Sequence, residues 1–279
     1  MNRTILRYYC ENCNNILKET TTANLGVSNV ESCPFCGTLL RASLKKRLIT
    51  QIRHKPKPLF QKASQIPKLT LDIPKLDSVL HFLTLGQKIR VSGIHAQKII
   101  ERICVRAQLP SRYGGLNSKV LLIDGANSSD LYQCVDFAQQ YGHDVNKILN
   151  GIISSRAFTV YQLANTIIKE LHNAIRQYDV KIIVITNLLC YFTNDPYLDT
   201  HEMKIILKEI IKTLNKIQNC LIVVSFDIPT QYDYLFSELF SRTINIQQIH
   251  NALSVHLDDN GKKSLLLLKQ DTLKIIPQH

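Results

Sequence analysis

The sequence predicts an α/β fold, with a mostly parallel central sheet and helices on both faces, preceded by a small metal-binding module. From about residue 70 onward, continuously apolar runs alternate with longer segments of helical periodicity. Apolar runs without polar alternation are typical of strands buried on both faces, and the helices between them make neighbouring strands parallel. A further observation, two Cys-x-x-Cys motifs before residue 40, indicates the small module.

The strands and helices of the large domain follow one another in a regular order. Strand-like runs cover residues 88–93, 118–125, 150–158, 180–189 and 219–227, and helical segments between them cover residues 97–109, 128–142, 159–178 and 201–217. The runs "SRTINIQQI", "ALSVHLDD" and "KSLLLLKQ" end the domain. We expect these last strands to extend the sheet in antiparallel fashion.

Basic side chains concentrate in one segment of the chain. The net charge of +12 and pI of about 9.3 favour a polyanionic partner, most simply nucleic acid. No acidic residue lies between Glu31 and Asp72, whereas nine Lys and Arg do, and three prolines within residues 53–68 favour an extended connector. We predict a basic linker over residues 40–68 that either contacts DNA phosphates without reading sequence or is a merely solvated connector. The candidate DNA-binding residues are Arg41, Lys45, Lys46, Arg47, Arg53, Lys55 and Lys57.

The first four of the eight cysteines have the spacing of a metal site. "CENC" and "CPFC" are separated by nineteen residues, and each pair can place two thiolates on one ion. Four thiolates suit a closed, structural Zn²⁺ site, whose binding would also fold a segment too short for a core. Disulfides and an iron–sulfur cluster are the alternatives. The predicted ligands are Cys10, Cys13, Cys33 and Cys36.

The chain has no apolar stretch near the ~20 residues of a membrane span. Its N-terminus, "MNRTILRYYC", lacks the apolar run of a signal peptide. We therefore expect an intracellular, cytoplasmic protein, associated with the nucleoid if it binds DNA.

A continuous block of the large domain resembles a known family. The segment "AQLPSRYGGLNSKVLLIDGANSSDLYQCVDFAQQYGHDVNKILNGIISSRAF" (107–158) resembles the ATPase core of RecA-family recombinases, and in particular the archaeal RadA group. "QLP", "GG", "ID", "YG" and "RAF" fall at the family's spacing without gaps. The resemblance implies a RecA-like core over residues 69–279, after a zinc ribbon over residues 1–39 and the linker over residues 40–68.

The nucleotide-binding loop implied by this resemblance is degenerate. Such a loop needs glycines whose neighbouring N–H groups wrap phosphates, a Lys, and a Ser or Thr hydroxyl for Mg²⁺. In "VSGIHAQKII" (91–100), Gly93 is the single glycine, and one alignment puts Ser92 and Gln97 at the two glycine positions and Ile99 at the hydroxyl position. Counting back from "QLP" instead makes the loop two residues short. Lys98 is retained, either for a weak phosphate contact or as an ordinary solvated helix lysine.

Other positions of the implied site are also changed. Where the family has a catalytic acid two residues after Asp124 of "ID", this chain has Ala126. Asp130 replaces an arginine that stacks on adenine, and Thr186 replaces the aspartate on the Mg²⁺ side. Losing the hydroxyl and both acids removes most of the electrostatic stabilisation of phosphoryl transfer. We therefore predict a pseudo-ATPase that is not an enzyme and has no ATP or Mg²⁺ cofactor.

A short motif in the linker indicates a protein partner. "FQKA", Phe60 to Ala63, resembles the F-x-x-A tether with which RadA-type protomers dock on a neighbouring core. A Phe and an Ala three residues apart on an extended segment can fill two apolar pockets.

The segments at the family's DNA-binding loops, 190–203 and after residue 227, carry few basic residues, so we expect DNA contacts in the linker and ribbon instead.

Three functional hypotheses follow. The first is a non-catalytic RadA-like paralogue, an accessory or mediator protein in homologous recombination and DNA repair that binds single-stranded DNA and a RadA-type recombinase. The second is a zinc-ribbon scaffold with a RecA fold in another nucleic-acid complex. The third is an ATPase with an atypical nucleotide site.

Overall fold

The computed structural model describes residues 66–127, 129, 131–194, 199–226 and 232–273, together with the course of three strands nearer the N-terminus. The chain divides into two compact units, Met1–Lys62 and Ala63–His279. No helix in the described part of the chain combines the length and apolar character needed to cross a bilayer.

The first unit contains a three-stranded antiparallel sheet. Its strands are β1 (Thr4–Cys10), β2 (Ile16–Thr21) and β3 (Leu44–Thr50), in the order β2-β1-β3. β3 pairs with β1 along its full length, so the segment that we expected to be a linker contributes a strand to this unit. Cys10 is the last residue of β1, and the other three predicted zinc ligands lie outside the described residues. The zinc site and the domain boundaries stay predictions.

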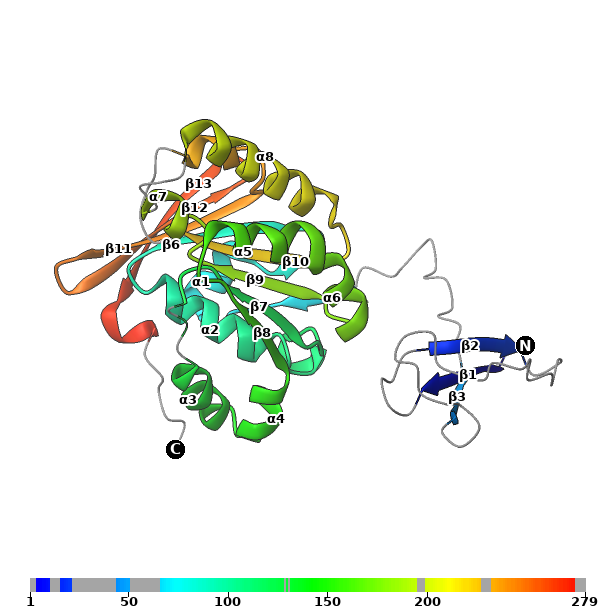
Figure 1. The fold of residues 1–279 in the computed structure, drawn as a ribbon. Helices are drawn as coiled ribbons and strands as arrows, with labels where there is room; N and C mark the ends of the chain where they lie inside the picture. The colour runs from blue at the N-terminus through cyan, green and yellow to red at the C-terminus, as the bar shows by residue number, and fades with distance from the viewer. Residues whose placement is uncertain are drawn as a thin grey trace. The chain divides into compact units, whose positions relative to one another are not determined.

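The second unit is built on an eight-stranded sheet in the order β13-β12-β11-β6-β10-β9-β7-β8 (Figure 1). The strands from β11 to β8 are parallel to one another, which confirms the predicted mostly parallel sheet. β12 pairs in antiparallel fashion with β11, and β13 with β12. The antiparallel extension that we expected from β11 onward therefore begins at β12. The bounds are β6 Lys88–Gly93, β7 Val120–Asp124, β8 Ile152–Arg156, β9 Ile182–Thr186, β10 Leu221–Phe226, β11 Arg242–Ile249, β12 Ala252–Asp259 and β13 Lys262–Lys269.

Helices join these strands. They are α1 (Pro74–Leu80), α2 (Ala96–Arg106), α3 (Tyr132–Gln140), α4 (Val145–Asn150), α5 (Val160–Asn165), α6 (Leu171–Tyr178), α7 (Cys190–Asn194) and α8 (Thr200–Lys216). A π-helical turn, Thr166–Glu170, joins α5 to α6, so the helix predicted over 159–178 forms with one widened turn. Short 3₁₀ turns lie at Ser111–Tyr113, Asp233–Phe236 and Gln270–Leu273, and a small antiparallel pair, β4 (Lys68–Leu69) and β5 (Leu83–Thr84), flanks α1.

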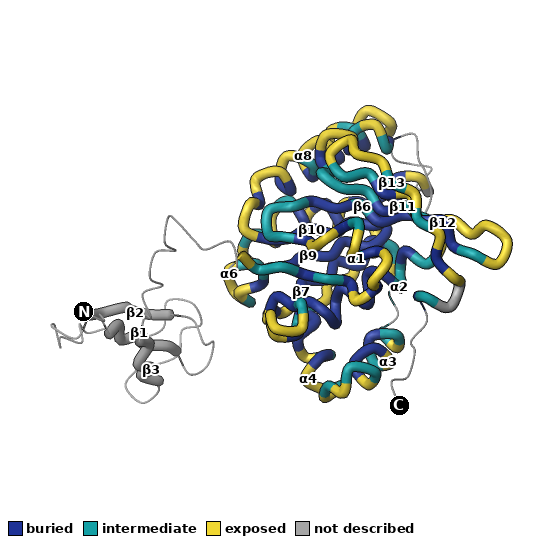
Figure 2. Tube along the Cα trace, turned by 180° about the vertical axis from the view of Figure 1, so that it is seen from behind, coloured by how far each residue is buried: buried dark blue, intermediate teal, exposed yellow. Residues whose placement is uncertain are grey.

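The sheet separates two apolar cores. Along the strands, Leu122 and Val184 pack with α1–α4 on one face, while the adjacent Ile123 and Ile185 pack with α5–α8 on the other. The central strands are accordingly buried along their length (Figure 2). This two-sided burial explains why the strand sequences are continuously apolar.

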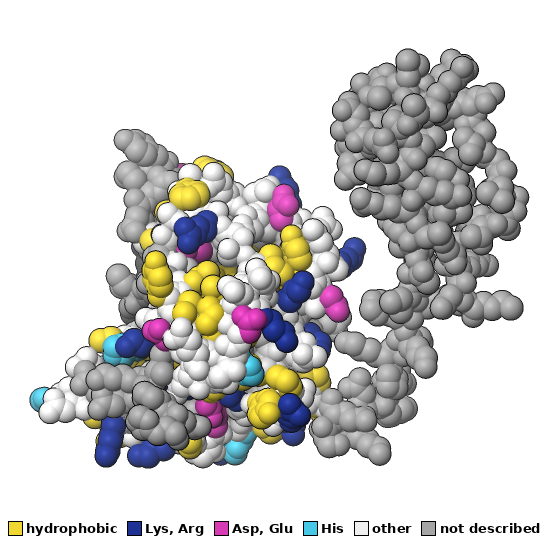
Figure 3. Space-filling model, turned by 90° about the horizontal axis from the view of Figure 1, so that it is seen from below, with side chains coloured by type: hydrophobic (Ala, Val, Ile, Leu, Met, Phe, Trp, Pro, Cys, Tyr) yellow, Lys and Arg dark blue, Asp and Glu magenta, His cyan; other side chains and the backbone are white. Residues whose placement is uncertain are grey.

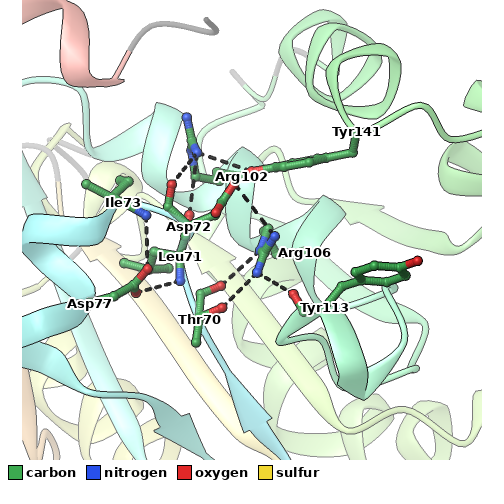
Figure 4. Close-up of polar contacts among 9 residues, drawn as sticks. All are labelled: Thr70, Leu71, Asp72, Ile73, Asp77, Arg102, Arg106, Tyr113 and Tyr141. Atoms are coloured by element: carbon green, nitrogen blue, oxygen red, sulfur yellow. Dashed lines mark hydrogen bonds and ion pairs between the residues drawn. The ribbon is translucent and has the colours of Figure 1, made fainter. Parts of the chain in front are cut away.

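Two buried arginines of α2 fasten the start of the second unit to the core. Arg102 donates from Nη1 to the carbonyl oxygen of Asp72 at 3.2 Å and to the hydroxyl oxygen of Tyr141 at 3.2 Å (Figure 4). Its guanidinium also lies over the ring of Phe137. One turn later, Arg106 donates to the carbonyl and hydroxyl oxygens of Thr70 at 3.1 and 2.7 Å. These bonds fix the chain on α2, the helix at whose start the sequence predicts a degenerate nucleotide site.

Candidate functional site

The connection between β6 and α2 occupies the position of a phosphate-binding loop. β6 ends at Gly93 and α2 begins at Ala96, so only Ile94 and His95 connect them. The N–H group of Ile94 donates to the carbonyl oxygen of Ile246 in β11 at 2.9 Å. A phosphate cradle needs several backbone N–H groups directed at the ligand. In this connection the loop is too short to wrap a phosphate, and its first amide is engaged by the sheet.

The packing of β11 explains why Gly93 is a glycine. Its φ is +87°, and a Cβ atom at this position would lie 2.0 Å from the carbonyl oxygen of Ile246 and 2.8 Å from Oδ1 of Asn245. Both the backbone conformation and the close approach exclude a larger residue. The packing of β6 against β11 therefore accounts for a glycine at position 93, and no phosphate ligand is needed to explain it.

The first turn of α2 directs its apolar side chains into the core. Ile99, at the position of the Mg²⁺-binding hydroxyl, is 1% exposed and belongs to the core on the α2 face. Gln97 donates from Nε2 to Oε1 of Glu101 at 2.9 Å. His95 begins the helix with a left-handed φ of 64°, and burial together with the nearby Lys98 lowers the pKa of its imidazole.

Lys98 is the remaining candidate for a phosphate contact in this turn. It is half-buried and makes no hydrogen bond or ion pair with the residues that the structure describes. Ser92, the other predicted position, is buried as the next-to-last residue of β6 and is paired in register with Phe226 and Asn245 of the adjacent strands.

The structure places Asp124, Ala126 and Thr186 together at the carboxyl ends of the adjacent strands β7 and β9. The buried carboxylate of Asp124 accepts hydrogen bonds from the N–H groups of Ser129 at 2.9 Å and Ala126 at 3.3 Å, and from the hydroxyl of Thr186 at 3.2 Å. The Ser129 and Thr186 hydroxyl oxygens are 3.3 Å apart. This carboxylate is thus used to hold the turn after β7 against β9.

Sequence analysis did not identify Ser225 as a member of this polar edge. Ser225, near the end of β10, is buried, accepts a hydrogen bond at 2.9 Å from the N–H of Asn187, and donates at 3.3 Å to the Oδ1 of Asn187. The available signal was a polar residue at the end of a continuously apolar run, the same pattern that marks Thr186. Together these groups form a compact network whose hydrogen bonds are largely internal.

The remaining predicted site residues lie elsewhere. Lys45, Lys46 and Arg47 belong to β3. The other candidate DNA-binding residues and the docking pair lie outside the described residues; they are Arg41, Arg53, Lys55, Lys57, Phe60 and Ala63. Of the two expected DNA loops, residues 190–194 form α7, while residues 195–198 and 227–231 are not described.

A parallel sheet with helices on both faces, and a polar network at its carboxyl edge, defines a nucleotide-binding type of α/β domain. Comparison with known proteins shows what this domain is similar to. Residues 93–230 match the Rad51 family model, so this segment is similar to a Rad51/RecA-family domain. This finding confirms the predicted RecA-like core, whereas the closer assignment to the archaeal RadA group stays a prediction.

Plant recombination proteins are among the similar sequences. The meiotic recombination protein DMC1 homolog A of Oryza sativa subsp. japonica is 23% identical over 190 residues, which cover 66% of this chain and 53% of that protein. The DMC1 homolog of Arabidopsis thaliana is 25% identical over 143 residues, covering 48% of this chain and 40% of that protein. The match thus spans about half the length of these relatives or less.

Proposed function

We propose that this protein is a non-catalytic paralogue of the Rad51/RecA recombinases, acting as an accessory or mediator protein in homologous recombination and DNA repair. The observation that carries this proposal is the two-residue connection between β6 and α2, in which the amide of Ile94 is bonded to the carbonyl of Ile246. Opening a phosphate site there would require breaking this contact and lengthening the connection. The sequence changes at Ile99, Ala126 and Thr186 point the same way.

Nucleotide hydrolysis is the first test. Mg-ATP hydrolysis is measured on the full chain, with and without single-stranded DNA, beside the variant Lys98→Ala. We expect background hydrolysis for both proteins, because the hydroxyl and the two carboxylates that handle Mg²⁺ and water are replaced. Hydrolysis by the natural chain that disappears in Lys98→Ala would overturn the proposal and favour an ATPase with an atypical site.

DNA binding is proposed for the basic segment of the chain. On the face of the second unit in Figure 3, Lys and Arg side chains are spread among acidic, apolar and neutral ones instead of forming one broad stripe. The segment between Glu31 and Asp72, by contrast, carries nine basic residues and no acidic one. Contacts from such a segment would be made to phosphates and would show little preference among sequences.

Salt dependence tests this assignment. Affinity for a single-stranded oligonucleotide is measured over a range of salt for the triple variant in which Arg53, Lys55 and Lys57 become Gln. If all three contact phosphates, the slope of log affinity against log salt should fall in magnitude by about 2. A matched triple Gln variant of the exposed α8 residues Lys208, Lys212 and Lys216 should leave the slope unchanged. Equal effects of the two variants would contradict binding through the linker.

A RecA-fold recombinase is the proposed protein partner, contacted through Phe60 and Ala63. Phe60→Glu should abolish capture of the recombinase by this chain, because a charge would enter an apolar pocket. Leu59→Glu introduces the same charge one residue earlier and serves as the control. Equal capture by Phe60→Glu and the natural chain would refute docking through this motif.

The described core also offers a surface where an extended segment of another protomer could add. β8 is the last strand of the sheet, and Ser154, Ser155 and Arg156 on it are exposed. Beside it lies a cavity of about 400 Å³ under α6, lined by Ile153 and Ala174 among others. An open strand edge next to a side-chain pocket suits recognition by strand addition. This edge supports a place for the chain within an assembly of RecA-fold protomers.

The proposal also includes a structural Zn²⁺ held by Cys10, Cys13, Cys33 and Cys36. Four thiolates at this spacing leave no open coordination position, so the ion would stabilise the first unit and take no part in a reaction.

A further inference from the structure

A second polar cavity lies away from the degenerate nucleotide site. It opens on the α8 side of the sheet, beside β6 and β11, and has a volume of about 580 Å³. Lys88 and Arg90 of β6 and Thr243 of β11 line it from the sheet. Its walls come from the end of α8, the segment 236–241 and the turn between β12 and β13 (Figure 1).

Lys88 contributes a positive charge to this cavity from a side chain whose stem is largely covered. The residue is 8% exposed, and its ammonium makes no hydrogen bond or ion pair with the part of the chain that the structure describes. Burial lowers the pKa of this ammonium. A partly desolvated ammonium without a partner is less stable than one in open water, so an acceptor that enters the cavity would be stabilised by meeting it.

Arg90 adds a second cation to the same cavity. It lies two residues after Lys88, hence on the same face of β6, and its Nη2 atom pairs with the carboxylate of Asp233. Its guanidinium lies over the ring of Phe226, with 4.6 Å between the guanidinium carbon and the ring centroid. The Nε atom is buried and has no hydrogen-bond partner among the described residues. Among the described residues, Lys88 therefore offers the cavity an ammonium without an acceptor, whereas the Nε of Arg90 is enclosed and Arg90 contributes mainly its charge.

The rest of the lining limits which anion would fit. Asp258, which accepts a hydrogen bond from the N–H of Gly261 at 2.8 Å, and the exposed Glu238 also line the cavity. These carboxylates repel a multiply charged anion such as phosphate and attract an ammonium or hydroxyl group. The amides of Asn215 and Asn260 supply further polar contacts.

We propose that this cavity is a binding site for a small carboxylic acid that carries a hydroxyl or ammonium group. Its carboxylate would lie at Lys88 and Arg90, and its second polar group would face Asp258 and Glu238. The site is independent of the nucleotide site and of the role in recombination, so neither proposal depends on the other.

The test follows Lys88 itself. Full-length protein labelled with ¹³C at lysine Cε is titrated with L-serine as the probe, and with acetate, inorganic phosphate and sodium chloride at equal ionic strength. The Lys88 signal is assigned by its absence in Lys88→Met. L-serine should move this signal saturably, acetate should move it more weakly, and the exposed Lys262 should not respond.

Matched variants keep the result interpretable. Lys88→Met retains the buried stem and removes the unpaired charge, so it should fold at least as stably as the natural chain and lose the thermal stabilisation by L-serine. Lys262→Met should keep that stabilisation. A Lys88 signal that moves no further with L-serine than with chloride would overturn the site. Tighter binding of phosphate than of L-serine would overturn its assignment to a carboxylic acid.

Discussion

Replacing Gly93 by Ala separates a structural glycine from a phosphate-binding one. The added Cβ would stand 2.0 Å from the carbonyl oxygen of Ile246, and the residue would have to hold a φ of +87°. The left-handed conformation costs about 1 kcal/mol for a residue with a Cβ, and displacing a packed strand costs a further ~2 kcal/mol. We expect the free energy of unfolding to fall by about 3 kcal/mol, which lowers the melting temperature of a domain of this size by roughly 10 °C.

Gly261→Ala is a suitable control for this experiment. Gly261 has almost the same φ, +88°, but a Cβ there would meet no atom within 4 Å. It therefore isolates the backbone strain, and we expect it to cost about 1 kcal/mol. Urea unfolding of the two variants measures the difference. Equal losses would refute the reasoning, because the contact between β6 and β11 would then carry none of the effect.

Three further predictions concern other parts of the molecule. Arg106→Met should lower the free energy of unfolding by about 2 kcal/mol in a urea titration, since it leaves three part-buried acceptor oxygens of Thr70 and Tyr113 without this donor, whereas the exposed Arg112→Met should have little effect. Burial and the nearby Lys98 lower the pKa of His95, so the unfolded chain binds the proton more tightly than the folded protein does. The natural protein should therefore lose stability as the pH falls below about 6.5. The variant His95→Asn tolerates the left-handed backbone and should lack this loss when the melting temperature is measured against pH. Chelation of zinc should unfold the first unit while leaving the melting of the second unchanged, and Cys33→Ser should lower the zinc content measured by mass spectrometry; a zinc content equal to that of the natural chain would argue against the four-thiolate site.

The architecture of the second unit was predictable because its information is local. Runs such as "VKIIVITNLL" are apolar at every position since both faces of β9 are covered, and the amphipathic segment 201–217 corresponds within a residue to α8. The direction in which β11 joins the sheet, parallel to β6, was not predictable in this way. Whether a strand joins its neighbour in parallel or antiparallel direction depends on the path of the chain over β6, which no local pattern records.

Charge gave an incomplete picture of the first unit. Residues 40–68 were interpreted from their Lys, Arg and Pro content, which indicates a solvated connector, yet Leu44–Thr50 pairs with β1. A strand at the edge of a small sheet often carries Lys and Arg, so a basic composition does not exclude it. The same basic residues can then belong to a folded module and still offer charges to a polyanion.

The candidate site was predictable in its positions but not in the roles of its residues. Asp124 and Gly93 are two residues that give the sequence the appearance of a nucleotide site, and both have structural partners. The carboxylate of Asp124 caps the N–H groups of the turn after β7, and Gly93 admits the backbone of β11. A fold can therefore keep such residues for packing after the groups that bind Mg²⁺ have been replaced. The proposed loss of nucleotide chemistry is therefore compatible with the match of residues 93–230 to the Rad51 family, because Ile99 offers no oxygen ligand and Thr186 offers a hydroxyl where a carboxylate is expected.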